Sequence, residues 1–244
     1  MELCTLRLAI PELREPRWAT LKVALSKGED EALVENSFRL LLVPREHLRP
    51  RLSEGLKVAV YTKVPHPRLA LIARELKHAS YEVTLSDSLP TGANIVLTTD
   101  LSYDGVIESF VKEGGRVLLL ITQGGILRLG GREICIDKRE GHWITGYHYI
   151  KDKISSPLPL TNPLGLEGHA IVPRYVMRGR GASPHEALAG YFEGWIWAWG
   201  ASVLNVEREY GKVLLTSLNL DHYLEDPVAT TLYDNMFKFI CKGL

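Results

Sequence analysis

Two histidines offer the first chemistry that this sequence suggests. His142 and His148 lie six residues apart, and Asp137 and Asp152 stand on either side of them. Imidazole and carboxylate groups are ligands of zinc, but they bind it only when they converge on one point. Aromatic residues surround both histidines, which is typical of a packed hairpin. We therefore expect no metal ion here and a structural role for these side chains.

A catalytic nucleophile is harder to find. Asp221 and His222 offer the acid and the base of a triad, but the pattern supplies no activated serine or cysteine to complete it. Thr122 follows a buried strand, at the position where a class I glutamine amidotransferase carries its cysteine in a tight turn. No candidate base accompanies this threonine. The sequence therefore predicts no catalytic residue.

Cofactor binding is not indicated either. The loop Lys63–Pro67 follows the first buried strand, where an α/β protein would place a phosphate-binding loop. It contains no glycine and lacks both the GxGxxG and the GxxxxGK[ST] patterns, which let backbone N–H groups approach phosphate. We expect no nucleotide and no other cofactor.

Three of the five tryptophans lie close together. If this segment is extended, Trp195, Trp197 and Trp199 share one face of a strand, because side chains alternate along it. Such a stripe packs inside the protein or against another domain, forms an oligomer interface, or stacks on sugar rings. Internal packing is the leading interpretation, and the other two remain open.

The charge balance excludes two classes of partner. Lysine plus arginine equals aspartate plus glutamate, at 29 each among 244 residues, so the formal net charge is zero. A neutral chain has no overall field to attract nucleic acid or an anionic membrane. We expect neither as a partner.

Residue usage also indicates a compartment. The three cysteines are odd in number and widely spaced, which argues against a disulfide framework and favours a reducing environment. No apolar run approaches the ~18 residues of a membrane span. A cytoplasmic location is therefore expected. Gln123 is the only glutamine, and scarce amides indicate a thermophilic source.

The elements that position these residues follow from hydrophobic periodicity. From Lys57 onward, short apolar runs alternate with helical patterns, which indicates an α/β fold with a mostly parallel sheet and helices on both faces. This order of elements resembles the flavodoxin or amidotransferase type. The stretch 124–190 is less regular, and we expect it to insert hairpins and loops at the carboxyl edge. The predicted strands are Lys57–Thr62, Tyr81–Leu85, Ala93–Thr98 and Arg116–Ile121, and the predicted helices are Pro67–Ala79 and Tyr103–Lys112.

The first part of the chain shows a different pattern. Thr20–Leu25 and Phe38–Val43 predict antiparallel strands joined by a turn at Lys27–Asp30. So few strands bury too little area to stand alone. We expect them to pack on the rest of the chain or on a second copy. The sequence is therefore divided into a small β segment, residues 1–50, and an α/β domain, residues 51–244.

The last part pairs a buried strand with a helix. Val213–Leu215 begins an apolar run, Asp226 is placed to cap a helix, and Pro227 fits its first position. Apolar residues then recur at helical spacing from Val228 to Ile240, which indicates a stripe that packs on the sheet.

Taken together, these segments resemble a known family. The strands Ala19–Leu25 and Val34–Pro44, the amidotransferase-like unit, the segment Phe192–Trp195 and the final strand and helix resemble the carboxyl-terminal region of glycoside hydrolase family 2 enzymes. These are enzymes of the β-galactosidase, β-mannosidase and β-glucuronidase type. The resemblance implies a non-catalytic accessory or oligomerisation module. The catalytic glutamates of that family lie on an upstream barrel, for which roughly 250 further residues are needed.

The resemblance also implies partners. These are an upstream catalytic barrel domain or further copies of the chain, with carbohydrate as a possible ligand. Two alternatives remain: the amidotransferase-like trimerisation domain of a family 42 β-galactosidase, and a stand-alone enzyme of the amidohydrolase or amidotransferase type. The lack of a cysteine at the Thr122 position separates the last alternative from the others.

Overall fold

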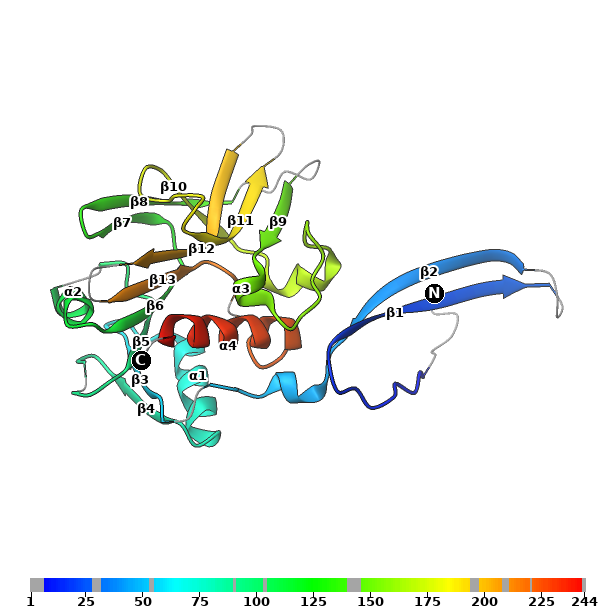
Figure 1. The fold of residues 1–244 in the computed structure, drawn as a ribbon, viewed down its shortest axis with the longest axis horizontal. Coiled ribbons are helices and arrows are strands. Elements are labelled where there is room, and N and C mark those ends of the chain that lie inside the picture. The colour runs from blue at the N-terminus through cyan, green and yellow to red at the C-terminus, as the bar shows by residue number, and fades with distance from the viewer. Residues whose placement is uncertain are drawn as a thin grey trace.

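The protein has an α/β body from which a two-stranded ribbon projects (Figure 1). The fold is taken from a computed structural model. It describes residues 7–27, 32–52, 55–89, 91–102, 105–139, 146–193, 198–207, 211–219 and 221–242.

The body is built on a parallel core of five strands. In space they run β4-β3-β5-β6-β13, and every neighbouring pair is parallel. Counted along the chain this is the order 2-1-3-4-5 of doubly wound, flavodoxin-like sheets, so the predicted fold class is confirmed. Apolar residues fill the strands because both faces of the sheet are covered. The bounds are β3 Lys57–Tyr61, β4 Glu82–Ser86, β5 Ile95–Thr98, β6 Arg116–Leu120 and β13 Lys212–Thr216.

Helices cover both faces of this core. Helices α1 (Pro67–His78) and α4 (Pro227–Cys241) pack on one face, and α2 (Gly105–Lys112) packs on the other. The start of α4 is as predicted, since Oδ1 of Asp226 accepts a hydrogen bond of 2.8 Å from the backbone N–H of Ala229. Three short helical segments lie against α4. They are η1 (Arg45–Leu48), α3 (Asp152–Ser155) and η2 (Leu166–Ile171).

The irregular middle of the sequence extends the same sheet. We expected it to insert hairpins at the carboxyl edge, but its strands continue the sheet beyond β13 with antiparallel pairing. Strand β12 makes this possible, because it pairs with β11 on one side and, on the other side, with β13 along its second half and with β10 at Ala201. The added strands are β7 Gly125–Leu129, β8 Arg132–Lys138, β9 Gly146–Ile150, β10 Tyr175–Arg178, β11 Ala187–Glu193 and β12 Ala198–Glu207.

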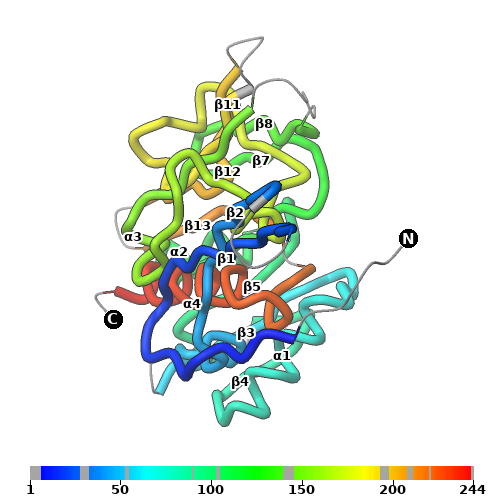
Figure 2. The backbone as a smooth tube through the Cα atoms, turned by 90° about the vertical axis from the view of Figure 1, so that its right-hand side faces the viewer, coloured from blue at the N-terminus to red at the C-terminus, as the bar shows by residue number. Residues whose placement is uncertain are grey.

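The projecting ribbon consists of β1 (Arg17–Ser26) and β2 (Ala32–Leu42), and we call it the arm. The two strands pair antiparallel with each other, as the sequence predicts. Figure 2 views the molecule from the side on which the arm extends. Among the described residues, the base of the arm contacts the body: Nε1 of Trp18 donates a hydrogen bond of 2.7 Å to the carbonyl of Pro159, and Leu41 packs beside Val228 and its neighbours.

Candidate functional site

The carboxyl ends of the parallel strands form a small polar cleft. Ligands of open α/β sheets bind at this edge, because loops from neighbouring strands converge there. The cleft has a volume of about 120 Å³. It is lined by residues that follow β3, β6 and β13 and by residues just before and at the start of β10. These include His66, Thr122, Arg174, Tyr175, Ser217, Asn219 and Asp221.

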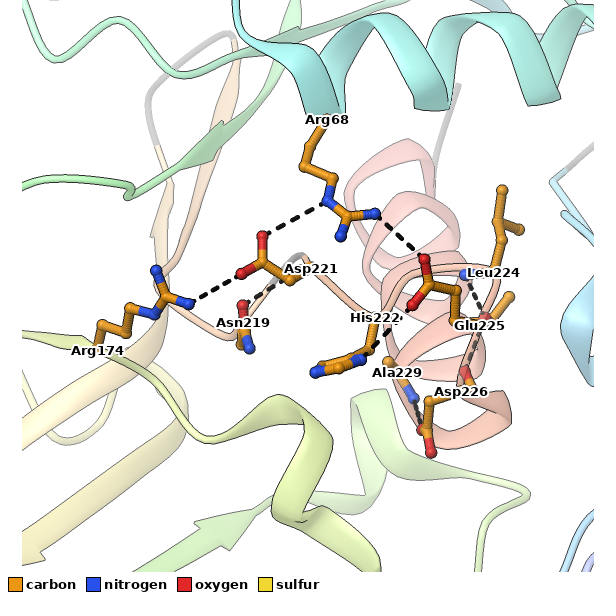
Figure 3. A network of polar contacts seen from close by, with 10 residues as sticks. Arg68, Arg174, Asn219, Asp221, His222, Leu224, Glu225, Asp226 and Ala229 are labelled. Carbon is orange, nitrogen blue, oxygen red and sulfur yellow. Dashed lines mark hydrogen bonds and ion pairs between the residues drawn. The ribbon is translucent and has the colours of Figure 1, made fainter.

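Asp221 organises the charges of this cleft (Figure 3). Nη2 of Arg174 donates a hydrogen bond of 3.0 Å to its Oδ2 atom. Nε of Arg68 lies 3.6 Å from its Oδ1 atom. The loop is held in turn, because the side-chain oxygen of Asn219 accepts a bond of 3.1 Å from the backbone N–H of Asp221. Arg68 also pairs with Glu225 at 3.4 Å, so two arginines and two carboxylates balance one another.

This arrangement holds a carboxylate in place rather than activating one. Both oxygens of Asp221 face a guanidinium, so both are already engaged in ion pairs. The Ser217 hydroxyl donates a bond of 3.3 Å to the carbonyl of Ser202 instead of pairing with a base. Nδ1 of His66 is buried and has no hydrogen-bond partner among the described residues. The described residues of the cleft therefore offer polar contacts to a small molecule, and no hydrogen bond between a nucleophile and a base is found among them.

The cleft joins residues that the sequence analysis had considered separately. Thr122 and Asp221 come from loops far apart in sequence, and both line it. Arg68, Arg174 and Asn219 were missed. Arg68 directly follows the loop Lys63–Pro67 at the carboxyl end of β3, so its position in the sequence could have indicated a place in the cleft. Arg174 lies in the irregular stretch 124–190, where no sequence pattern indicates its position.

The two histidines for which we expect a structural role are only partly described. His142 lies outside the described residues, and His148 sits in β9 with its ring edge against Tyr191, at 4.9 Å between ring centroids. Burial, aided by the positive charge of Arg139, lowers the pKa of His148 to about 4. Asp137 instead faces Arg178, at 4.0 Å. Within the described ranges, no three histidine, cysteine, aspartate or glutamate side chains gather as metal ligands.

The tryptophan stripe is also only partly described. Trp195 and Trp197 lie outside the described residues. Trp199 is half-buried in β12, packs against the apolar cluster on the α2 side of the sheet, and donates a hydrogen bond of 3.3 Å from Nε1 to the hydroxyl of Tyr149. A role of the three side chains as a sugar platform or an interface stays a prediction.

Helix α4 carries a buried carboxylate, that of Asp234. The carboxylate of Asp234 accepts hydrogen bonds from the hydroxyl of Tyr223 at 3.2 Å and from the backbone N–H of Arg51 at 2.9 Å. Burial raises the pKa of Asp234 to about 6 although these bonds act against the shift. The sequence did not identify Asp234 as a buried group, because it lies in the middle of α4 and belongs to no recognisable motif.

Fold and cleft together define a doubly wound α/β protein with a polar cleft at the carboxyl edge of its sheet. No family model matches the sequence, and no curated protein matches it. A β-galactosidase from Rahnella sp. R3 is similar in structure, with a TM-score of 0.47 and 18% identity over 76% of this chain; the match spans 32% of the β-galactosidase chain. A cytoplasmic protein from Salmonella typhimurium LT2 has a TM-score of 0.40 and 11% identity, with 92% of this chain and 96% of that one covered.

None of the helices in the described ranges combines the length and the apolar character that crossing a bilayer requires.

Proposed function

We propose that this chain is a non-catalytic accessory module that works by contacting other polypeptide chains, and that the enzyme it serves is a glycoside hydrolase. The choice of enzyme rests on the sequence resemblance to the carboxyl-terminal region of family 2 enzymes. The mode of action rests on one observation, the apolar face of the arm.

The arm has two faces of opposite character. Directly paired residues of antiparallel strands place their side chains on the same face. One face carries Arg17 with Leu42 at the base of the arm and then four further pairs, which we call the apolar face: Ala19 with Leu40, Leu21 with Phe38, Val23 with Asn36, and Leu25 with Val34. The other face carries Trp18 with Leu41 at the base, where both contact the body, and then the pairs Thr20 with Arg39, Lys22 with Ser37, and Ala24 with Glu35.

The apolar face is open to solvent. Phe38 is 50% exposed, Val34 55% and Leu25 63%. Scattered apolar side chains are ordinary on a protein surface, but a continuous patch on a projecting element marks a contact site. The sharp division between the two faces supports a contact on one side of the arm only.

The cleft agrees with a non-catalytic role. Cleavage of a glycosidic bond needs two carboxyl groups placed across that bond, one of them able to give up a proton. Asp221 is held by Arg174 and Arg68, and Glu225 is paired with Arg68. Both carboxylates therefore form ion pairs that hold the loop preceding α4 against α1 and the segment just before β10.

Nitrophenyl glycosides test this proposal. The purified chain is expected to show no turnover of galactoside, mannoside or glucuronide substrates, and Asp221→Asn is expected to change nothing. Turnover that a single Asp or Glu substitution in this chain abolishes would overturn the proposal. Turnover that survives every such substitution would instead point to a contaminating enzyme, and repeated purification to constant specific activity distinguishes the two.

A further inference from the structure

We infer that a second copy of this chain covers the apolar face of the arm, with the two arms lying against each other about a two-fold axis. This inference rests on the proposed function, because it names the polypeptide that the accessory module contacts.

An uncovered arm would be poorly stable. A two-stranded ribbon is marginal in water unless further strands or another element cover its apolar side. The opposite face needs no cover, since Nζ of Lys22 pairs with Glu35 at 3.2 Å and the guanidinium of Arg39 lies 4.4 Å above the ring of Trp18. Only the apolar face therefore requires a partner.

The chemistry of this face favours an identical partner. Its four residue pairs include no charged side chain, and Asn36 is their only polar residue. Charged and polar groups are what select a different protein and exclude wrong ones. In a two-fold contact every pairing occurs twice, residue i with j and j with i, and residues near the axis meet their own counterparts, so a charge there would meet a like charge. The middle of this face, around Leu21 and Phe38, is uncharged and suits such a contact, and the charge of Arg17 lies away from it at the base of the arm.

The area available fits a dimer in which each arm reaches the body of the other copy. Ten residues at about 3.3 Å each make a ribbon roughly 33 Å long and about 10 Å wide, or ~330 Å² of contact. Stable interfaces bury about 800 Å² on each partner, so contact between the arms alone is too small. The base of the arm supplies the rest.

A groove lies where the arm meets the body. It has a volume of about 710 Å³, and Leu40, Val228 and Leu166 are among its lining residues. Leu166 is 92% exposed, although it is a large apolar side chain. When two arms lie antiparallel, the tip of one meets the base of the other. Leu25 and Val34 at the tip would then cover Leu166 of the second copy.

Neighbouring residues on opposite faces of β2 provide a matched test. We would measure the sedimentation of the full chain, Phe38→Asp and Ser37→Asp from low to high micromolar concentration. The wild type and Ser37→Asp should form dimers. Phe38→Asp should weaken the dimer by ~100-fold or more, because it places an unpaired charge in an apolar contact. Leu166→Asp tests the groove and should weaken the dimer as well.

The outcomes separate the two proposals. Thermal unfolding at a concentration where all variants are monomeric checks that Phe38→Asp still folds, and Leu25→Asp at the tip serves as a second variant. A monomeric wild type, a trimer, or a dimer that tolerates both Phe38→Asp and Leu25→Asp would overturn the inference. A monomer without glycosidase activity leaves the proposed accessory function standing, whereas turnover within this chain would remove that function whatever the oligomeric state.

Discussion

Arg174 donates a hydrogen bond of 3.0 Å from Nη2 to Oδ2 of Asp221, and this contact joins the two halves of the sheet. Arg174 precedes β10 in the antiparallel half, whereas Asp221 follows β13, the last strand of the parallel core. The cleft at the carboxyl edge is therefore closed by a charge pair between segments 47 residues apart.

Removing the carboxylate of Asp221 should cost little stability. Asp221→Ala leaves Arg174 and Arg68 without this partner, but the groups are partly exposed, so each pair contributes only about 0.2–1 kcal/mol. We expect a small drop in melting temperature at low salt that shrinks at high salt, because ions screen exposed charges. Differential scanning calorimetry with Asp87→Ala as a surface control measures both. A large loss that ignores salt would show that Asp221 has a packing role.

A methyl group at Gly211 should destabilise the core. A Cβ there would lie 2.3 Å from the carbonyl oxygen of Val111 and 2.7 Å from that of Gly115, and neither backbone atom can move freely. Gly211→Ala is expected to cost about 1–3 kcal/mol in urea unfolding, the range for overpacked sites. Gly105→Ala is the matched control, since its Cβ meets nothing within 4 Å. Equal stability of the two variants would contradict this close approach.

Asp234 should make stability fall as the pH rises. Burial raises its pKa from 3.8 to about 6, so the folded chain holds this proton more tightly than the unfolded chain. The resulting stabilisation is complete below pH 3.8 and is lost as the pH rises through about 6. Asp234→Asn cannot titrate and should gain on the wild type between these values, by on the order of 2 kcal/mol. Parallel unfolding curves against pH would exclude this effect.

His148 should act in the opposite sense. Burial lowers its pKa from 6.5 to about 4, so the unfolded chain binds this proton more readily. Its stabilisation is complete above pH 6.5 and is lost as the pH falls through about 4. His148→Phe keeps an aromatic ring beside Tyr191 and takes up no proton. Its stability relative to the wild type should therefore rise on acidification, which urea unfolding across this range detects; a constant difference would argue for a solvated imidazole.

Trp199 distinguishes packing from sugar binding. Trp199→Ala removes a half-buried ring and its bond to the Tyr149 hydroxyl, so we expect a loss of about 2–4 kcal/mol. Trp199→Phe should recover part of it, because the ring is kept and only the N–H is lost. Unchanged melting, together with tryptophan quenching by galactosides or mannosides, would favour a carbohydrate platform.

The sequence predicted the parallel core well because its signals are local. Lys57–Tyr61 and Arg116–Leu120 are short apolar runs, and Asp226 with Pro227 marks the start of α4 by two capping preferences. These features depend on neighbouring residues only. Helix α1 was accordingly predicted to within one residue, as Pro67–Ala79 against the observed Pro67–His78.

The antiparallel half and most of the site depend on distant contacts. Strand β10 has four residues, and its place is set by pairing with β8 and β12 on either side. Arg174 reaches the cleft only because β10 is held there. Thr122 and Asp221 could be located from the strand ends, whereas the partners of Asp221 could not. The faces of the arm likewise required the register of β1 on β2.

The position of β13 in the middle of the sheet determines when, during synthesis, the sheet can be completed. Its neighbour β6 ends at Leu120, and roughly ninety residues must be translated before β13 begins at Lys212. At about 5–20 residues per second, a ribosome needs roughly 5–20 s for this stretch. During that interval the nascent chain displays the apolar edge strand β6 without its parallel neighbour, and exposed edges of this kind recruit other strands. Chaperone dependence during synthesis should therefore centre on residues 116–120, far in sequence from the strand that finally covers them.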